Sequence, residues 1–175
     1  MRLRQKTLLL ISALLVSLIA VLYGSLSVIL GRSFADLEAE DTQRNVQRVK
    51  EALSEEIKQL NVSAEDYASW DDTYAYVVGQ NAGYPAINLI DESFAGLGIN
   101  AIALLNDQAE IVFGTGFDLE AESRTSLPPG LKAQFVSENP LVTHGNLDSE
   151  TTGILMLEDQ AILLASQPIL TSAAT

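Results

Sequence analysis

The chain has 175 residues, no cysteine and one histidine, His144, a length that predicts one domain with an appended segment. Residues 1–32 hold four bases and no acid, whereas residues 33–175 hold all 23 acids against six bases, a net charge of −17. Without cysteine, disulfides and thiolate chemistry are excluded. The acidic surface repels nucleic acid and anionic lipid, so no nucleic-acid partner is expected.

The first predicted element is a transmembrane helix over residues 8–30. This run is uncharged and rich in Leu, Ile and Val, and as a helix it reaches about 35 Å, enough for a hydrocarbon core of about 30 Å. Bases precede the run and acids follow it, so residues 1–7 are expected in the cytoplasm and the remainder in the periplasm, anchored to the inner membrane. A cleaved signal peptide is the alternative, but its apolar stretch is normally about 7–15 residues long.

Residues 33–60 predict a stalk helix. Apolar side chains recur at three- and four-residue steps from Val46 to Leu60, the pattern of an amphipathic helix. Because no Gly or Pro separates Arg32 from Leu60, the membrane helix is expected to continue into this stalk. Two interpretations stay open: a surface helix of one domain, or a signal-carrying stalk that pairs with a second copy in a homodimer.

Residues 61–175 predict a domain with α+β order. Ser63 and Asp66 fit a capping box before a helix over 64–78, and Asn88 can cap a short helix over 89–95. Two hairpins follow, at 99–117 and about 153–170, with a short helix near 131–135 between them. Helices and hairpins in this order describe an antiparallel sheet with flanking helices. The chain ends without a closing element, so we expect a fragment.

The stretch "DYASWDDTYAYV" at residues 66–77 is the densest chemistry in the chain. On a helical wheel, Trp70, Tyr74 and Val77 form an apolar seam, whereas Asp71 and Asp72 point apart. Asp66 is either the cap partner of Ser63 or a ligand contact. An aromatic pocket with acids at its edge suits a neutral or amine-bearing small molecule.

Catalysis fits this sequence poorly. Adjacent carboxylates that diverge on a helix cannot share acid–base work, and His144 lies in a Gly-flanked loop, where we expect it to be solvated. Metal-ligand spacing and a phosphate-binding glycine loop are missing from the sequence. We therefore expect no catalytic residue, no metal and no cofactor.

The combination of "DYASWDDTYAYV" with "Asn81…Tyr84", "NL" at 88–89, Phe94 and the hairpin "INAIALLNDQAEIVFGTGFD" resembles the fourth type of CHASE domain, an extracytoplasmic sensory domain. The resemblance covers about residues 33–170. By motif position it marks Asp66, Trp70, Asp71, Asp72, Tyr74, Asn81, Tyr84 and Asn88. With the adjacent Tyr67, these form the predicted ligand site.

The resemblance implies a PAS-like sheet on a helical stalk, with a last strand that this chain lacks. It also implies the ligand-sensing input of a receptor whose output is a diguanylate cyclase, a cyclic-di-GMP phosphodiesterase or a histidine kinase. The chain itself is then not an enzyme. A membrane-anchored periplasmic enzyme and a partner-binding structural protein are the rival functions.

Overall fold

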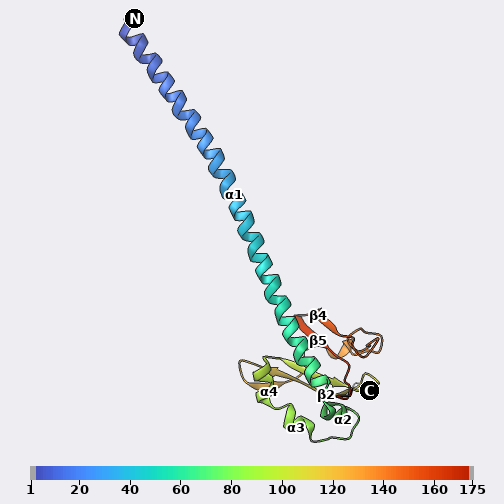
Figure 1. Cartoon of the computed structure of the whole chain (residues 1–175). Coiled ribbons are helices and arrows are strands. Elements are labelled where there is room, and N and C mark those ends of the chain that lie inside the picture. Colours follow the sequence, from blue (N-terminus) through green and yellow to red (C-terminus); the bar gives the residue numbers. More distant parts are fainter. Residues whose placement is uncertain (1–2, 174–175) are drawn as a thin grey trace. The chain divides into compact units, whose positions relative to one another are not determined.

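The computed structural model describes the backbone of residues 3–173, and their side chains except those of 3, 28–37 and 39. The first element, α1 (Leu3–Ala68), is a single helix (Figure 1). The chain divides into two compact units, residues 1–52 and 53–175, and α1 contributes to both. The predicted continuation of the membrane helix into the stalk is therefore confirmed.

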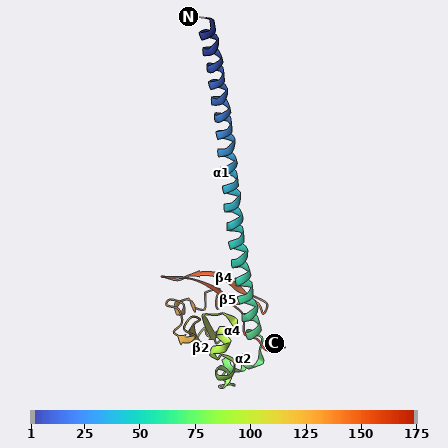
Figure 2. The same cartoon turned by 90° about the vertical axis from the view of Figure 1, so that its left-hand side faces the viewer.

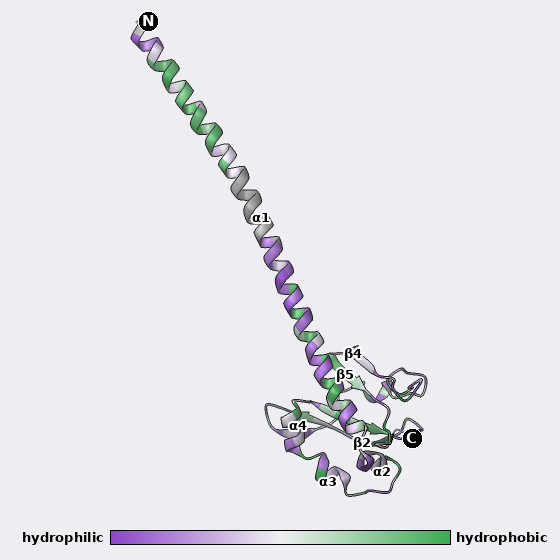
Figure 3. Ribbon diagram, in the orientation of Figure 1, coloured by the Kyte–Doolittle hydropathy of each residue, from purple (hydrophilic) through white to green (hydrophobic). Residues whose placement is uncertain are grey.

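The N-terminal part of α1 contains a candidate membrane span, Arg4–Ser27. Figure 3 shows this part as a nearly continuous apolar band, whereas the α1 residues from about 40 onward are mostly polar. Its described apolar side chains are exposed, as Leu14 (72%) and Leu10 (71%) illustrate. By its length and composition, this part of α1 is able to span a bilayer.

The predicted interruption of the helix at residues 61–66 is wrong, because α1 runs on to Ala68. Ser63 does not cap a new helix; its Oγ donates to the carbonyl of Gln59 at 3.1 Å. Serine inside a helix commonly forms such a bond to the carbonyl four residues earlier. The domain that we predicted from residue 61 therefore begins within a helix.

Three short helices follow α1. They are α2 (Asp71–Val77), α3 (Tyr84–Asn88) and α4 (Asp91–Leu97). α3 was not predicted from the sequence, although Pro85 in its first turn is a favoured helix start. Asn88 is not the cap of α4, because Ile90 occupies that position. α4 ends at Gly98, which has a φ of 66°.

The strands form two antiparallel sheets rather than the single sheet that we predicted. One sheet has the order β1 (Ala101–Leu105), β2 (Ile111–Asp118) and β3 (Ser123–Thr125). The other is a hairpin of β4 (Thr151–Met156) and β5 (Ala161–Ser166), and the turned view also shows it apart from β2 (Figure 2). A 3-10 helix, η1 (Lys132–Gln134), lies between the sheets in sequence. Both predicted hairpins and the α+β class are confirmed.

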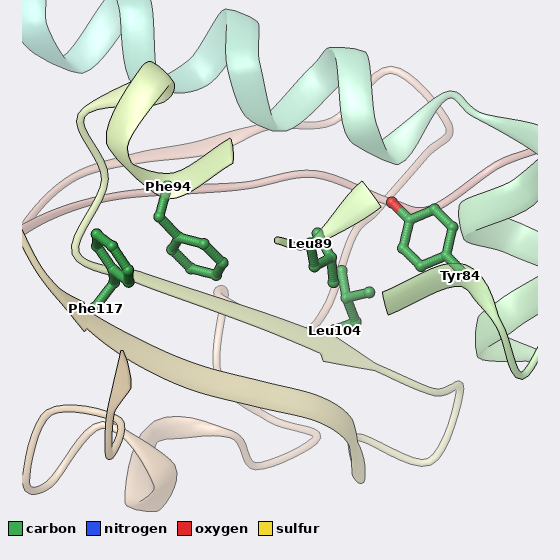
Figure 4. Packing of buried hydrophobic residues seen from close by; sticks show 5 residues of the cluster. All are labelled: Tyr84, Leu89, Phe94, Leu104 and Phe117. Atoms are coloured by element: carbon green, nitrogen blue, oxygen red, sulfur yellow. The ribbon is translucent and has the colours of Figure 1, made fainter. Parts of the chain in front are cut away.

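Hydrophobic side chains pack in two clusters. The larger joins α3 and α4 to β1 and β2 (Figure 4); its buried members are Tyr84, Leu89, Phe94, Leu104 and Phe117. The smaller consists of Leu127, Leu131 and Leu157, against which Ala101 and Ala103 of β1 also pack. Since successive side chains on a strand point to opposite faces, β1 is packed on both faces.

Gly116 is expected to be sensitive to substitution because β2 passes close to the backbone that follows β3. A Cβ at Gly116 would lie 2.3 Å from the carbonyl oxygen of Ser126. Gly116→Ala should therefore lower the free energy of unfolding by about 1–3 kcal/mol. Urea unfolding of the detergent-solubilised chain, followed by the fluorescence of its single tryptophan, would measure this.

Gly96 in α4 is the matched control, since a Cβ there meets nothing within 4 Å. Gly96→Ala should raise the free energy of unfolding by about 0.5–1 kcal/mol, because alanine favours the helix. Equal effects of the two substitutions would contradict the close approach at Gly116.

Candidate functional site

The aromatic segment is not one helix, as the sequence predicted, but the end of α1, a short break and α2. Trp70 occupies the break with an extended backbone, φ −83° and ψ 132°. Asp71 and Asp72 then lie in the first turn of α2, where the positive end of the helix dipole stabilises carboxylates by about 0.3–1 kcal/mol each. The two acids thus favour a new helix start directly after Trp70.

The break changes which aromatic side chains reach the core. Tyr67 stacks on Trp70 with ring centroids 4.5 Å apart, and Tyr76 stacks on Tyr84 at 5.5 Å. All four pack in the larger cluster, whereas Tyr74 is 37% exposed. The predicted seam is therefore wrong at Tyr74, because the wheel assumed a helix phase that the break resets.

A buried hydrogen bond lies beneath these rings. The Thr73 hydroxyl donates to the Tyr84 hydroxyl at 2.7 Å, and both residues have no exposed surface. Burial raises the pKa of the Tyr84 hydroxyl, although the bond from Thr73 lowers it. Sequence reasoning missed Thr73; its place between the aromatic residues gave no sign that it is buried.

The carboxylates point to different partners, as predicted. Asp71 accepts two bonds from Ser172, from the backbone N–H at 2.7 Å and from Oγ at 2.9 Å. Asp72 accepts from Nδ2 of Asn81 at 3.1 Å. Asp66 is exposed in the last turn of α1. Asp71 therefore holds the segment around Ser172, and Asp72 holds the segment around Asn81.

The nine predicted ligand-site residues differ in access to solvent. Tyr84 is buried, Tyr67, Trp70, Asn81 and Asn88 are half-buried, and Asp66, Asp71, Asp72 and Tyr74 are exposed. The side chain of Asn88 donates to the carbonyl of Tyr84 at 3.3 Å. The residues thus lie along one stretch of chain from the end of α1 through α3, and the exposed ones belong to α1 and α2.

The structure places a groove elsewhere in the unit that begins at Leu53. It has a volume of about 1120 Å³ and is lined by residues 55–63 of α1, by β1 and by β5. None of the nine predicted residues lines it.

Arg124 is one of the few bases outside α1, and it is held by protein groups. Its Nε donates to Asp91 Oδ1 at 2.5 Å, and its Nη2 donates to the carbonyl of Leu89. The guanidinium also lies 4.8 Å from the ring centroid of Phe94. Through these contacts, Arg124 links β3 to α4.

His144 is half-buried rather than solvated, which corrects our expectation. Its Nε2 lies 3.3 Å from Oγ of Ser166, and burial lowers the pKa of the imidazole. The Ser166 hydroxyl donates its proton to the carbonyl of Leu141 at 2.7 Å, so the histidine does not receive it. This contact bridges a loop to β5 and does not activate a nucleophile.

The Asp71–Ser172 contact predicts a pH-dependent tie. The two bonds from Ser172 lower the pKa of Asp71 below its ordinary 3.8. The stability that these bonds add is therefore fully present above about pH 3.8, and it is lost as the pH falls through the lower pKa of the folded state. Asp71→Asn should speed hydrogen exchange at the Ser172 amide several-fold at pH 6 and abolish the acid dependence. Asp66→Asn is the control. Unchanged exchange at Ser172 in Asp71→Asn would contradict the tie.

Comparison with known proteins places this chain in a family. The family model of the CHASE4 domain matches residues 52–175, which include the aromatic segment, both sheets and the groove. No solved structure matches the chain.

Among curated proteins, the chain is similar to the methanogenesis regulatory histidine kinase FilI of Methanothrix harundinacea (strain 6Ac), with 26% identity over 140 residues. The match covers 80% of this chain but 16% of that protein, so the chain spans about a sixth of the length of its relative. Because the CHASE4 family model matches residues 52–175, which are most of the sequence, the chain belongs to the CHASE4 domain family of sensory domains.

Proposed function

We propose that this chain is the extracytoplasmic, ligand-sensing input of a membrane receptor of the histidine kinase type, with its N-terminus in the cytoplasm. The observation that carries the proposal is the CHASE4 match over residues 52–175, which begins within the same helix that contains a candidate membrane span, Arg4–Ser27. The regulatory histidine kinase among its relatives favours that output over a cyclase or a phosphodiesterase.

The proposed orientation follows from charge. The bases at positions 2, 4 and 6 precede the uncharged run of residues 8–30, and the acids begin at Asp36, which favours a cytoplasmic N-terminus. Because the chain has no cysteine, single cysteines can report the topology in intact cells. A membrane-impermeant maleimide should label Thr42→Cys and leave Gln5→Cys unlabelled until the membrane is permeabilised. The reverse pattern would exclude the proposed orientation.

The aromatic segment, residues 66–77, is well placed to relay a signal, because it includes the end of α1 and contacts the C-terminal segment. The Leu170 N–H donates to the carbonyl of Ala68 at 2.9 Å, and Asp71 holds Ser172. A ligand would shift these contacts if it bound one arrangement of α2 more tightly than another. We propose that the nine residues of the predicted ligand site receive the ligand, with their exposed members making contact and the buried ones supporting them.

A neutral or amine-bearing ligand suits this acidic, aromatic surface. Thermal-shift screening of the detergent-purified chain with primary amines, amino acids and neutral polyols should give at least one stabilising compound. Asp72→Asn and Tyr74→Ala should abolish its effect, since both side chains are exposed on α2. Ile87→Ala is the control, because Ile87 is 72% exposed on α3 and does not belong to the predicted ligand site. Compounds that stabilise all variants equally would remove the ligand site from this segment.

Coupling to the membrane can be measured along the stalk. We propose that the chain acts as a homodimer whose α1 helices change their packing when a ligand binds. Single cysteines at Val46 and Val49, both exposed, should form disulfides between copies at rates that change when a stabilising compound is added. Identical rates from residue 46 to residue 60, with and without the compound, would contradict the coupling and leave the family assignment untouched.

A further inference from the structure

Polar side chains gather at the open end of the hairpin formed by β4 and β5. The residue pair at this end is Thr151 opposite Ser166. The Thr151 hydroxyl donates to the carbonyl of Pro140 at 2.9 Å, and the Ser166 hydroxyl donates to the carbonyl of Leu141 at 2.7 Å. Both strands are thereby fastened to residues 137–150, which lie between η1 and β4 and are called the junction loop below.

One side chain of α1 holds the same end of the hairpin. Asn61 donates from Nδ2 to Glu150 Oε2 at 2.5 Å, and its Oδ1 accepts from Gln167 Nε2 at 2.8 Å. Glu150 directly precedes β4, and Gln167 directly follows β5. A single asparagine thus joins α1 to the ends of both strands and, through Glu150, to the junction loop.

His144, the only histidine of the chain, lies in the junction loop. Its Nε2 is 3.3 Å from Ser166 Oγ. Because the Ser166 hydroxyl donates its own proton to Leu141, it can only accept from the ring, and the neutral imidazole therefore carries its proton on Nε2. The other ring nitrogen, Nδ1, is buried and has no hydrogen-bond partner among the residues that the structure describes.

A second proton on this ring would lack an acceptor. It would bind at Nδ1 and leave a charged, unpaired donor buried in the junction, which is unfavourable. Burial accordingly lowers the pKa of His144, whereas the backbone of Ser149 is the smaller and opposing cause and makes no hydrogen bond to Nδ1. Protonation therefore favours an arrangement in which the ring reaches water.

The charged residues around the junction do not offset this cost. β4 and β5 contain no charged residue. The acids of the junction loop are all exposed: Glu138, Asp148 and Glu150. On α1, the charged residues one turn before and one turn after the asparagine, Lys58 and Glu65, are exposed as well. Within the described part of the chain, no carboxylate forms an ion pair with the imidazole.

We propose that His144 is a proton-sensitive latch: the neutral ring holds the junction loop against the open end of the hairpin, and acid opens this junction by charging the ring. Because the pKa is lowered in the folded state, the latch stabilises the junction fully above the ordinary histidine pKa of about 6.5. Its contribution is lost as the pH falls through the lower folded value. The contacts of Asn61 link this opening to α1. As a second input to that helix the latch rests on the proposed function, whereas the opening itself does not.

Nitrogen NMR of the detergent-purified 175-residue chain tests the geometry directly, since one histidine gives one set of ring signals. At about pH 7.5 the ring should be the tautomer protonated on Nε2, and it should titrate below the ordinary pKa of about 6.5. A ring protonated on Nδ1, or titration at or above that value, would overturn the latch.

Thiol labelling with a maleimide measures the opening. Val142→Cys places one cysteine at a half-buried position of the junction loop, and Thr42→Cys, exposed on α1, corrects for the effect of pH on the thiol. From about pH 7.5 to 5.0, labelling at 142 relative to 42 should rise severalfold, up to about 30-fold, the limit for charging a histidine of ordinary pKa. With His144→Gln added, the ratio should stay constant. A constant ratio with His144 present, or the same rise with His144→Gln, would overturn the proposal.

Reciprocity tests the link to α1. If the latch and the contacts of Asn61 stabilise the same arrangement, loss of either favours opening. Asn61→Ala should therefore raise labelling at position 142 at about pH 7.5, whereas Asn45→Ala, exposed on the same helix, should not. Unchanged labelling in Asn61→Ala would overturn the link. Neither result concerns a ligand at the aromatic segment, which thermal-shift screening tests separately.

Discussion

Replacing Tyr84 by alanine is expected to lower the free energy of unfolding by about 3–5 kcal/mol, the usual cost of removing a large buried side chain. Tyr84 has no exposed surface and stacks on Tyr76. Figure 4 shows its ring beside Leu89 and Leu104, so truncation leaves a cavity between α3 and β1. Urea unfolding of the detergent-solubilised chain, followed by the fluorescence of Trp70, measures the change.

Tyr84→Phe separates the hydroxyl from the ring. It leaves the buried Thr73 hydroxyl without its partner, which should cost about 1–3 kcal/mol. Thr73→Val removes the other member of the pair. Since the double variant has neither polar group, its loss should be smaller than the sum of the single losses by about 0.5–3 kcal/mol. Additive losses would show that the two hydroxyls do not interact.

Phe94→Ala is the second substitution with a large expected effect, again about 3–5 kcal/mol. Phe94 has no exposed surface, and its ring stacks on Phe117 with centroids 5.3 Å apart, as Figure 4 shows. Removing the ring also removes the surface over which the Arg124 guanidinium lies. The same unfolding measurement applies.

Leu97→Ala is the control for Phe94→Ala, because Leu97 lies in the same helix but is 37% exposed. Its loss should be about 1 kcal/mol, typical of a point substitution outside a core. If the two variants lost the same stability, Phe94 would not be part of the core that joins α4 to β2. Tyr76 and Val77 of α2 pack against that core. Because the core thus positions α2, both large losses should also abolish any compound's effect in thermal-shift screening.

Much of the fold could be predicted because its signals are local. An uncharged run of membrane length, an amphipathic pattern without Gly or Pro, and alternating apolar residues around short turns each depend on neighbours in sequence. The long helix and both hairpins were predicted in this way. The hairpins agree with the prediction to within a few positions, whereas α1 runs on to Ala68, beyond the predicted end at residue 60. The family resemblance was also local, since it relied on spacing within residues 66–118.

The wheel failed for the aromatic segment because it needs an unbroken helix. A break at Trp70 brings Tyr76 to the core and leaves Tyr74 exposed. Nothing in the local pattern places the break, because the segment gains stability from Tyr67 stacking on Trp70 and from packing against distant residues. The predicted cap at Ser63 is wrong because α1 continues through this position, so the backbone N–H groups there bond within the helix and need no cap.

The sequence by itself thus determined the candidate membrane helix, the stalk, the α+β order and the family, because composition and periodicity depend on each element alone. Only the tertiary structure decided that Thr73 is buried against Tyr84, that Asp71 holds Ser172, and that residues of α1, β1 and β5 line one groove. These features join residues between 11 and 101 positions apart. Such contacts form only when the whole domain packs, since no local propensity specifies them.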